Sequence, residues 1–149
     1  MTEPQTMPDT TLILRRRFAA PRARVFEHWT DPGLFGAWYA FADTWETLDV
    51  EIDLRAGGHY RITWGVGERE FGESGEYLEV VAPERLVYTV TLSGTETADI
   101  ERTVCTVEFL EHGDETEVVI TEEGYPSVES RDLHASGWPK FLDRLERIV

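Results

Sequence analysis

The middle of the chain, residues 46–123, alternates apolar and polar side chains in short runs separated by tight turns. In residues 46–54, "ETLDVEIDL", every second side chain is aliphatic, which is the spacing of a strand with one buried face. Four side chains are predicted to face inward there: Leu48, Val50, Ile52 and Leu54. Consecutive strands with short connections pair as antiparallel neighbours, because a parallel pair needs a long crossover. The run therefore predicts an antiparallel sheet whose apolar face another element must cover.

The same period recurs elsewhere, so the sheet is expected to have about seven strands. The predicted strands cover residues 11–18, 46–54, 59–64, two runs around the Pro83 turn within 75–92, and a hairpin of residues 103–109 and 115–122. Several inward positions carry aromatic rings, which are predicted to line a space under the sheet: Tyr60, Trp64, Tyr88 and Phe109.

Two short helices are predicted between the first two strands. The first begins at Pro21 and places Val25 and Trp29 on one face. The second, "PGLFGAWY", has Asp31 as its expected N-cap and Pro32 at its first position.

Residues 128–148 are predicted to form one long amphipathic helix that covers the sheet. Its inward stripe follows steps of three or four residues: Ser127, Ser130, His134, Trp138, Phe141, Leu142, Leu145 and Ile148. Pro139 removes one backbone hydrogen bond, so a bend is expected near residues 135–139. Strands followed by one covering helix indicate an α+β fold in which a curved sheet grips the helix.

The chain is strongly acidic, with 14 basic and 29 acidic residues and a formal net charge of −15. Such a charge repels a phosphate backbone, so no nucleic-acid partner is expected. Arg15, Arg16 and Arg17 form a cluster, but strand alternation should divide them between two faces. No run of 18 apolar residues occurs, so no membrane insertion is expected.

Residues 1–10 are polar, lack the pattern of a secretory signal and are expected to be a flexible tail before a domain of residues 11–149. The single cysteine, Cys105, cannot form an intrachain disulfide, which fits a reducing compartment, and a cytoplasmic location is expected.

Five stretches, taken in order, resemble the START-like (SRPBCC) superfamily: "AAPRARVFEHWTDPGLFGAWYA", "RAGGHYRITW", "GEYLEVVAPERLVYTV", "GDETEVVITEEGY" and "HASGWPKFLDRLERI". More narrowly, they are similar to the bacterial group that resembles the C-terminal domain of the activator of Hsp90 ATPase. The resemblance runs from about residue 11 to residue 149. It implies a helix-grip fold, with seven antiparallel strands around the C-terminal helix and a cavity between them. Across the superfamily that cavity holds lipids, sterols, polyketides or plant hormones, and a few branches perform chemistry there.

The strongest candidate for a polar group in such a cavity is His134, with Ser130 on the same helix face. The alternative is a histidine that is satisfied by a nearby backbone carbonyl or carboxylate. Glu122 shares the parity of Ile120 and could point inward and pair with His134, but a solvated carboxylate at a frayed strand end is preferred. Around the second helix three rings are equally expected to form a lid or to belong to the core: Trp38, Phe41 and Trp45. Trp138 is expected to close the cavity floor.

No metal or cofactor is expected. His28 and His59 are predicted to be surface residues, and His112 is predicted to lie beside a turn. The histidines and the cysteine show no metal-binding spacing. Cys105 has the parity of a buried residue and is expected to be a small hydrophobe rather than a nucleophile.

Three functions are consistent with the sequence. The first is a carrier or sensor that binds a small hydrophobic or aromatic molecule in the cavity. The second is an enzyme of the cyclase, dehydratase or hydrolase type with His134 as acid and base. The third is a protein-interaction module, either chaperone-related or a homodimer.

Overall fold

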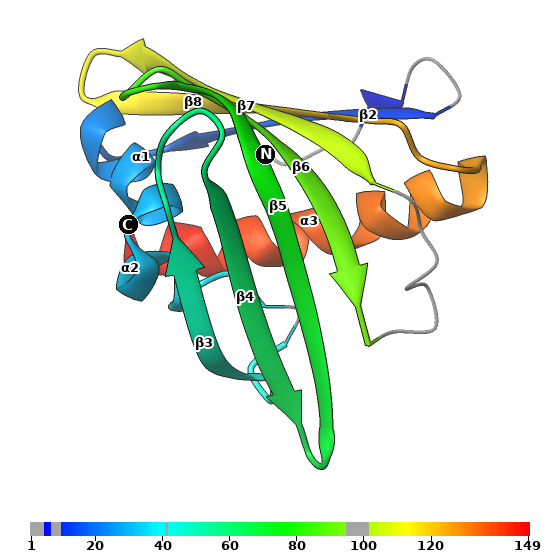
Figure 1. The fold of residues 1–149 in the computed structure, drawn as a ribbon. Helices are drawn as coiled ribbons and strands as arrows, with labels where there is room; N and C mark the ends of the chain where they lie inside the picture. Colours follow the sequence, from blue (N-terminus) through cyan, green and yellow to red (C-terminus); the bar gives the residue numbers. More distant parts are fainter. Residues whose placement is uncertain (1–4, 7–9, 41, 95–101) are drawn as a thin grey trace.

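The computed structural model describes residues 5–6, 10–40, 42–94 and 102–149 (Figure 1). The elements in chain order are β1 (Gln5–Thr6), β2 (Thr11–Phe18), α1 (Arg22–Thr30), α2 (Pro32–Gly36), β3 (Glu46–Ile52), β4 (His59–Val66), β5 (Arg69–Val81), β6 (Arg85–Ser93), β7 (Thr103–His112), β8 (Glu115–Glu123) and α3 (Val128–Ile148).

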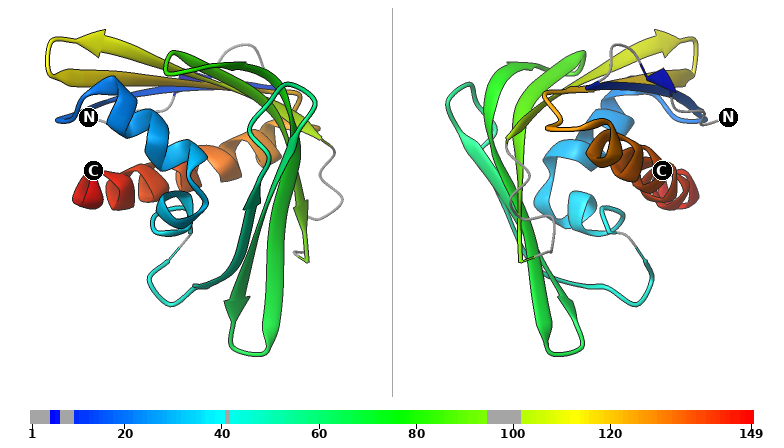
Figure 2. Two further views of the ribbon diagram at one scale, coloured as in Figure 1. Left: turned by 60° about the vertical axis from the view of Figure 1, so that its left-hand side comes forward. Right: turned by 90° about the vertical axis from the view of Figure 1, so that its right-hand side faces the viewer.

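One antiparallel sheet contains all the described strands, in the order β1-β2-β8-β7-β6-β5-β4-β3. The predicted seven-stranded curved sheet is confirmed, and the two-residue β1 adds a short edge beside β2. The sheet curls, and the three helices of the described residues lie on its concave side (Figure 2). The expected tail falls largely on residues 1–4 and 7–9, which lie outside the described part of the chain.

The helix ends follow the residues that can cap them. The Asp31 side chain accepts a hydrogen bond from the Leu34 amide at 3.0 Å, and Pro32 begins α2. The Ser127 side chain accepts from the Ser130 amide at 3.1 Å and begins α3. α3 then runs without interruption through Pro139, as predicted, while the bend there stays a prediction. None of the described helices is long and apolar enough to span a bilayer.

The C-terminal half of α3 packs tightly on the sheet. Leu142 and Leu145 are fully buried on the concave side. Arg16 of β2 is also buried, and its guanidinium lies 2.7 Å from Asp143 and 3.4 Å from Glu146 of α3. Arg15 and Arg17 are exposed, so the alternation does divide the arginine cluster.

Two of the predicted inward residues of the 46–54 run are in fact exposed, Leu48 by 46% and Leu54 by 38%. The register of β3 against β4 shifts between Thr47 and Asp49, and this bulge turns Leu48 to the outer face beside Gly65. Leu54 lies beyond the end of the strand.

The prediction that His28 is a surface residue was wrong, because its side chain is buried on α1. The ring Nδ1 of His28 lies 2.8 Å from the Arg24 carbonyl oxygen, which satisfies it one helical turn back. His59 is exposed, as predicted.

Gly75 of β5 should be intolerant of any side chain. A Cβ there would overlap the backbone carbonyl of Thr89 and lie 2.7 Å from the Tyr60 ring. Because the obstacle is backbone, we expect Gly75→Ala to lower the free energy of unfolding by at least about 3 kcal/mol. Gly67→Ala is the matched control. Gly67 has φ of +63° but open space around it, so Gly67→Ala should lower the free energy of unfolding by only about 1 kcal/mol. Urea denaturation of both variants measures the difference, and equal losses would contradict the steric argument.

Candidate functional site

A cavity of about 270 Å³ lies between the sheet and the N-terminal half of α3; we call it the outer chamber. Its lining is mostly apolar: Trp45, Trp64, Phe71, Gly72, Leu92, Leu133, His134, Ser136, Gly137 and Lys140. Trp45 stacks on Phe71 with ring centres 5.1 Å apart and meets Trp64 edge-on at 5.6 Å. Aromatic walls of this kind are typical of sites for small apolar molecules.

A second space of about 20 Å³, the inner chamber, lies against the outer one. The two share Leu92, His134 and Gly137 as lining residues. The inner chamber is also lined by Tyr39, Glu73, Val90, Glu122, Trp138 and Phe141. An apolar chamber therefore adjoins a small space that contains two carboxyl groups.

Glu73 projects from β5 and is only 5% exposed. The Tyr39 hydroxyl lies 2.8 and 3.0 Å from its two carboxyl oxygens, and the Tyr60 hydroxyl donates at 2.8 Å. Burial raises the pKa of Glu73, the two tyrosine hydrogen bonds lower it and the Glu122 charge raises it, so the pKa is about 7. This carboxyl therefore changes its charge near neutral pH.

Glu122 projects from β8 and is 2% exposed. Thr103 donates to it at 2.6 Å and the Trp138 indole N–H donates at 3.0 Å. The preference for a solvated Glu122 was wrong, because β8 does not fray at this point. Glu122 is paired with Leu12 on one side and Cys105 on the other, well inside the sheet.

His134 borders both chambers from α3. Its Nδ1 lies 2.9 Å from the Ser130 carbonyl oxygen, and its ring packs on Tyr125 with centres 5.1 Å apart. The side-chain hydroxyls of Ser130 and Tyr125 are buried without a hydrogen-bond partner among the described residues. Thr103 and Trp138 donate to Glu122, whereas the pairing with His134 that was considered for an inward Glu122 is not seen among the described residues.

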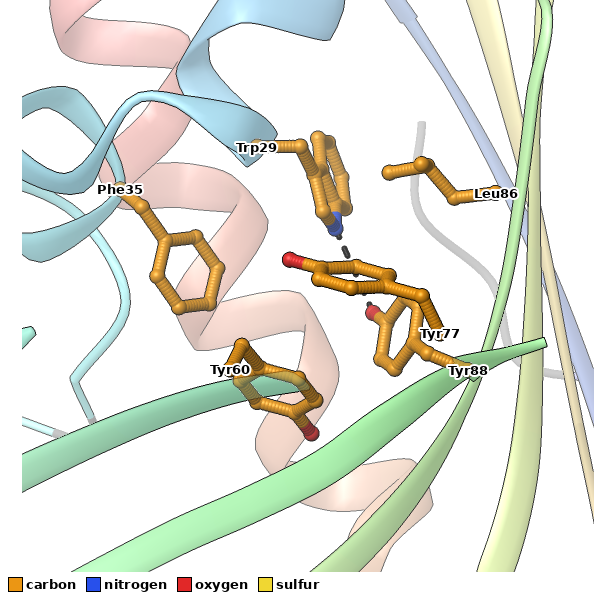
Figure 3. Close-up of a pocket in the computed structure, with 6 residues that line it drawn as sticks. All are labelled: Trp29, Phe35, Tyr60, Tyr77, Leu86 and Tyr88. Carbon is orange, nitrogen blue, oxygen red and sulfur yellow. Dashed lines mark hydrogen bonds between the residues drawn. The ribbon is translucent and has the colours of Figure 1, made fainter. Parts of the chain in front are cut away.

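Four of the other predicted lining residues line neither chamber, although the Tyr60 hydroxyl bonds Glu73 of the inner one. Trp38 and Phe109 are fully buried core residues that pack edge-on against Trp29. Tyr60 and Tyr88 line a third space of only about 10 Å³, where five rings and Leu86 face one another (Figure 3). Such a space holds at most one water molecule. Phe41 lies outside the described residues.

Sequence reasoning missed Glu73, Tyr39 and Phe71. The strand period contained a signal for two of them, because Phe71, Glu73 and Tyr77 are spaced two and four residues apart and so share one face of β5. Tyr39 had no such signal, since it follows α2 in a turn. Trp64 holds that turn in place by donating to the Tyr39 carbonyl at 2.7 Å. Within the described residues no three histidine, cysteine or acidic side chains are grouped to bind a metal.

The family model of Activator of Hsp90 ATPase homolog 1-like protein matches residues 19–149. Among solved structures, a protein from Rhodobacter sphaeroides is similar with a TM-score of 0.85 and 24% identity, covering 99% of this chain and 97% of that one. A protein from Chromobacterium violaceum has a TM-score of 0.82 and 25% identity, covering 95% and 98%. A protein from Mycobacterium smegmatis has a TM-score of 0.83 and 20% identity, and the match covers 99% of this chain and 96% of that one. No curated protein matches the sequence.

The raised pKa of Glu73 should make stability depend on pH. The folded state keeps a proton up to about pH 7 that an ordinary glutamate releases near 4.5, so the free energy of unfolding falls as pH rises between these values. Relative to Glu73→Gln, the wild type should lose about 2–3 kcal/mol between pH 5 and pH 8. Urea denaturation at several pH values measures this. Glu70→Gln, at an exposed carboxyl of the same strand, is the control and should follow the wild type. Parallel curves for the wild type and Glu73→Gln would contradict the assignment.

Proposed function

The chain belongs to the family of Activator of Hsp90 ATPase homolog 1-like proteins, and we propose that it binds a small, mainly apolar molecule in the outer chamber, as a carrier or a sensor. The observation that carries the proposal is the aromatic-walled cavity of about 270 Å³. An apolar cavity of about 150 Å³ is enough to hold benzene. The outer chamber therefore has room for a ligand with one or two rings.

The composition of the wall supports the proposal. Trp45, Trp64 and Phe71 supply flat apolar surface from the sheet side, and burial of such surface contributes roughly 25 cal/mol per Å². Gly137 supplies space from the helix side. A glycine inside a helix costs about 1 kcal/mol relative to alanine, and this one lines both chambers.

Indole is a suitable neutral probe, because it is flat, apolar and of two rings. At a concentration about 100 times its Kd it should add about 2.7 kcal/mol of stability, which for a chain of this size raises Tm by roughly 5–10 °C. Gly137→Leu should remove this shift by filling the chamber, and Gly137→Ala should weaken it by a smaller factor.

Leu110→Ala is the control for the indole measurement, since Leu110 is half-exposed at the far end of β7 and lines neither chamber. It should retain the full shift. Differential scanning fluorimetry, with calorimetric titration for Kd, separates the outcomes. An indole shift that is absent from the wild type, or that survives in Gly137→Leu, would contradict binding in the outer chamber.

A further inference from the structure

The surroundings of the two buried carboxyls contain groups that become negative when they ionise. Five such groups face them from different parts of the chain. They are Tyr39 of the turn after α2, Tyr60 of β4, Tyr88 of β6, Cys105 of β7 and Tyr125 of the segment after β8. Burial is the largest cause that raises the pKa of each of these groups, and negative charge on Glu73, Glu122 or both raises it further. A negative charge in addition to those of the two carboxyls is therefore unfavourable throughout this region.

Positive charge is scarce at the same place. The described lining of the inner chamber includes one basic side chain, His134 of α3, and no lysine or arginine. Lys140 lines only the outer chamber. A buried carboxylate without a cation is costly, so Glu73 and Glu122 together favour any cation that can reach them.

The hydrogen bonds to the two carboxyls also favour a bound cation. Tyr39, Tyr60, Thr103 and Trp138 all donate to the two carboxyl groups. An ionised carboxyl offers about four acceptor sites, and two donors on each leave acceptor capacity in the inner chamber. The site is therefore short of a hydrogen-bond donor that carries positive charge.

The space fits one small group. About 20 Å³ admits a group the size of a water molecule, and the inner chamber adjoins the outer one at Leu92, His134 and Gly137. A ligand whose rings lie in the outer chamber can thus extend a single ammonium group between the two carboxyls.

We infer that the ligand is an aromatic or apolar primary amine, whose protonated nitrogen binds Glu73 and Glu122 in the inner chamber while its rings occupy the outer chamber. The inference rests on the proposed function and names the ligand class for the same site. A neutral alcohol would leave the carboxylate charge uncompensated, and an acid would be repelled.

Two probes that differ only in the terminal group test the inference: tryptamine, which has an ammonium group, and tryptophol, which has a hydroxyl in its place. Isothermal titration at pH 8 and at least 150 mM salt should give a Kd for tryptamine at least tenfold lower than for tryptophol. Glu73→Gln and Glu122→Gln should each reduce that ratio about tenfold, mainly by weakening tryptamine binding. Tryptophol binding and Tm also report that each variant is folded.

The effect of pH gives an independent readout. Tryptamine stays protonated between pH 6 and pH 8, as an alkyl ammonium does, whereas Glu73 gains a proton as pH falls through about 7. The wild type should therefore bind tryptamine more weakly at pH 6 than at pH 8. In Glu73→Gln most of this dependence should disappear, although His134 still faces the site from α3.

Controls separate the inference from the proposed function and from surface attraction by the net charge of −15. Glu70→Gln removes an exposed carboxyl and should keep the full preference for tryptamine. Equal affinities for the two probes, or a preference that survives in both glutamine variants, would overturn the amine inference while the proposed function stands. If neither indole, tryptophol nor tryptamine binds the wild type, or if their binding survives in Gly137→Leu, the proposed function itself fails.

Discussion

The packing of the C-terminal half of α3 against β2 determines the rest of the interior. Leu142 and Leu145 are fully buried there, and the buried Arg16 pairs with Asp143 and Glu146 across the interface. From this packed end α3 continues across the concave side of the sheet. Towards its other end the sheet curves away, and the outer and inner chambers lie between them. Leu133, which lines the outer chamber from α3, is 54% exposed.

The two buried glutamates determine the chemistry of the inner chamber. Each is held by two donors, and Glu73 also has a pKa near neutrality because burial outweighs its tyrosine hydrogen bonds. Raising a carboxyl pKa from 4.5 to about 7 corresponds to roughly 3 kcal/mol against the ionised state. A cation bound between the carboxyls would offset this cost, which links ligand binding to the protonation of the interior.

Much of the fold could be predicted from the sequence, and less of the site. Period-two runs predicted the seven main strands, and the three-and-four stripe predicted α3 from Val128 to Ile148. The exceptions have local causes, such as the bulge that turned Leu48 outward and the carbonyl that satisfies the buried His28. His134, Trp138, Trp45 and Trp64 were predicted to line a cavity and do line the chambers. Glu73 was overlooked, although strand parity placed it inward with Tyr77.

The sequence by itself determined which side chains face the same way, since strand and helix periods are properties of the local backbone. It therefore specified the sheet, the covering helix and a stripe in which Ser130, His134 and Trp138 point inward. The tertiary structure alone decided which groups meet across the interior. Tyr39, Tyr60 and Glu73 come together from a turn and two strands, and Thr103, Trp138 and Glu122 from two strands and a helix. Such meetings depend on the curvature of the sheet and on where α3 crosses it, and the packing of the whole chain sets both.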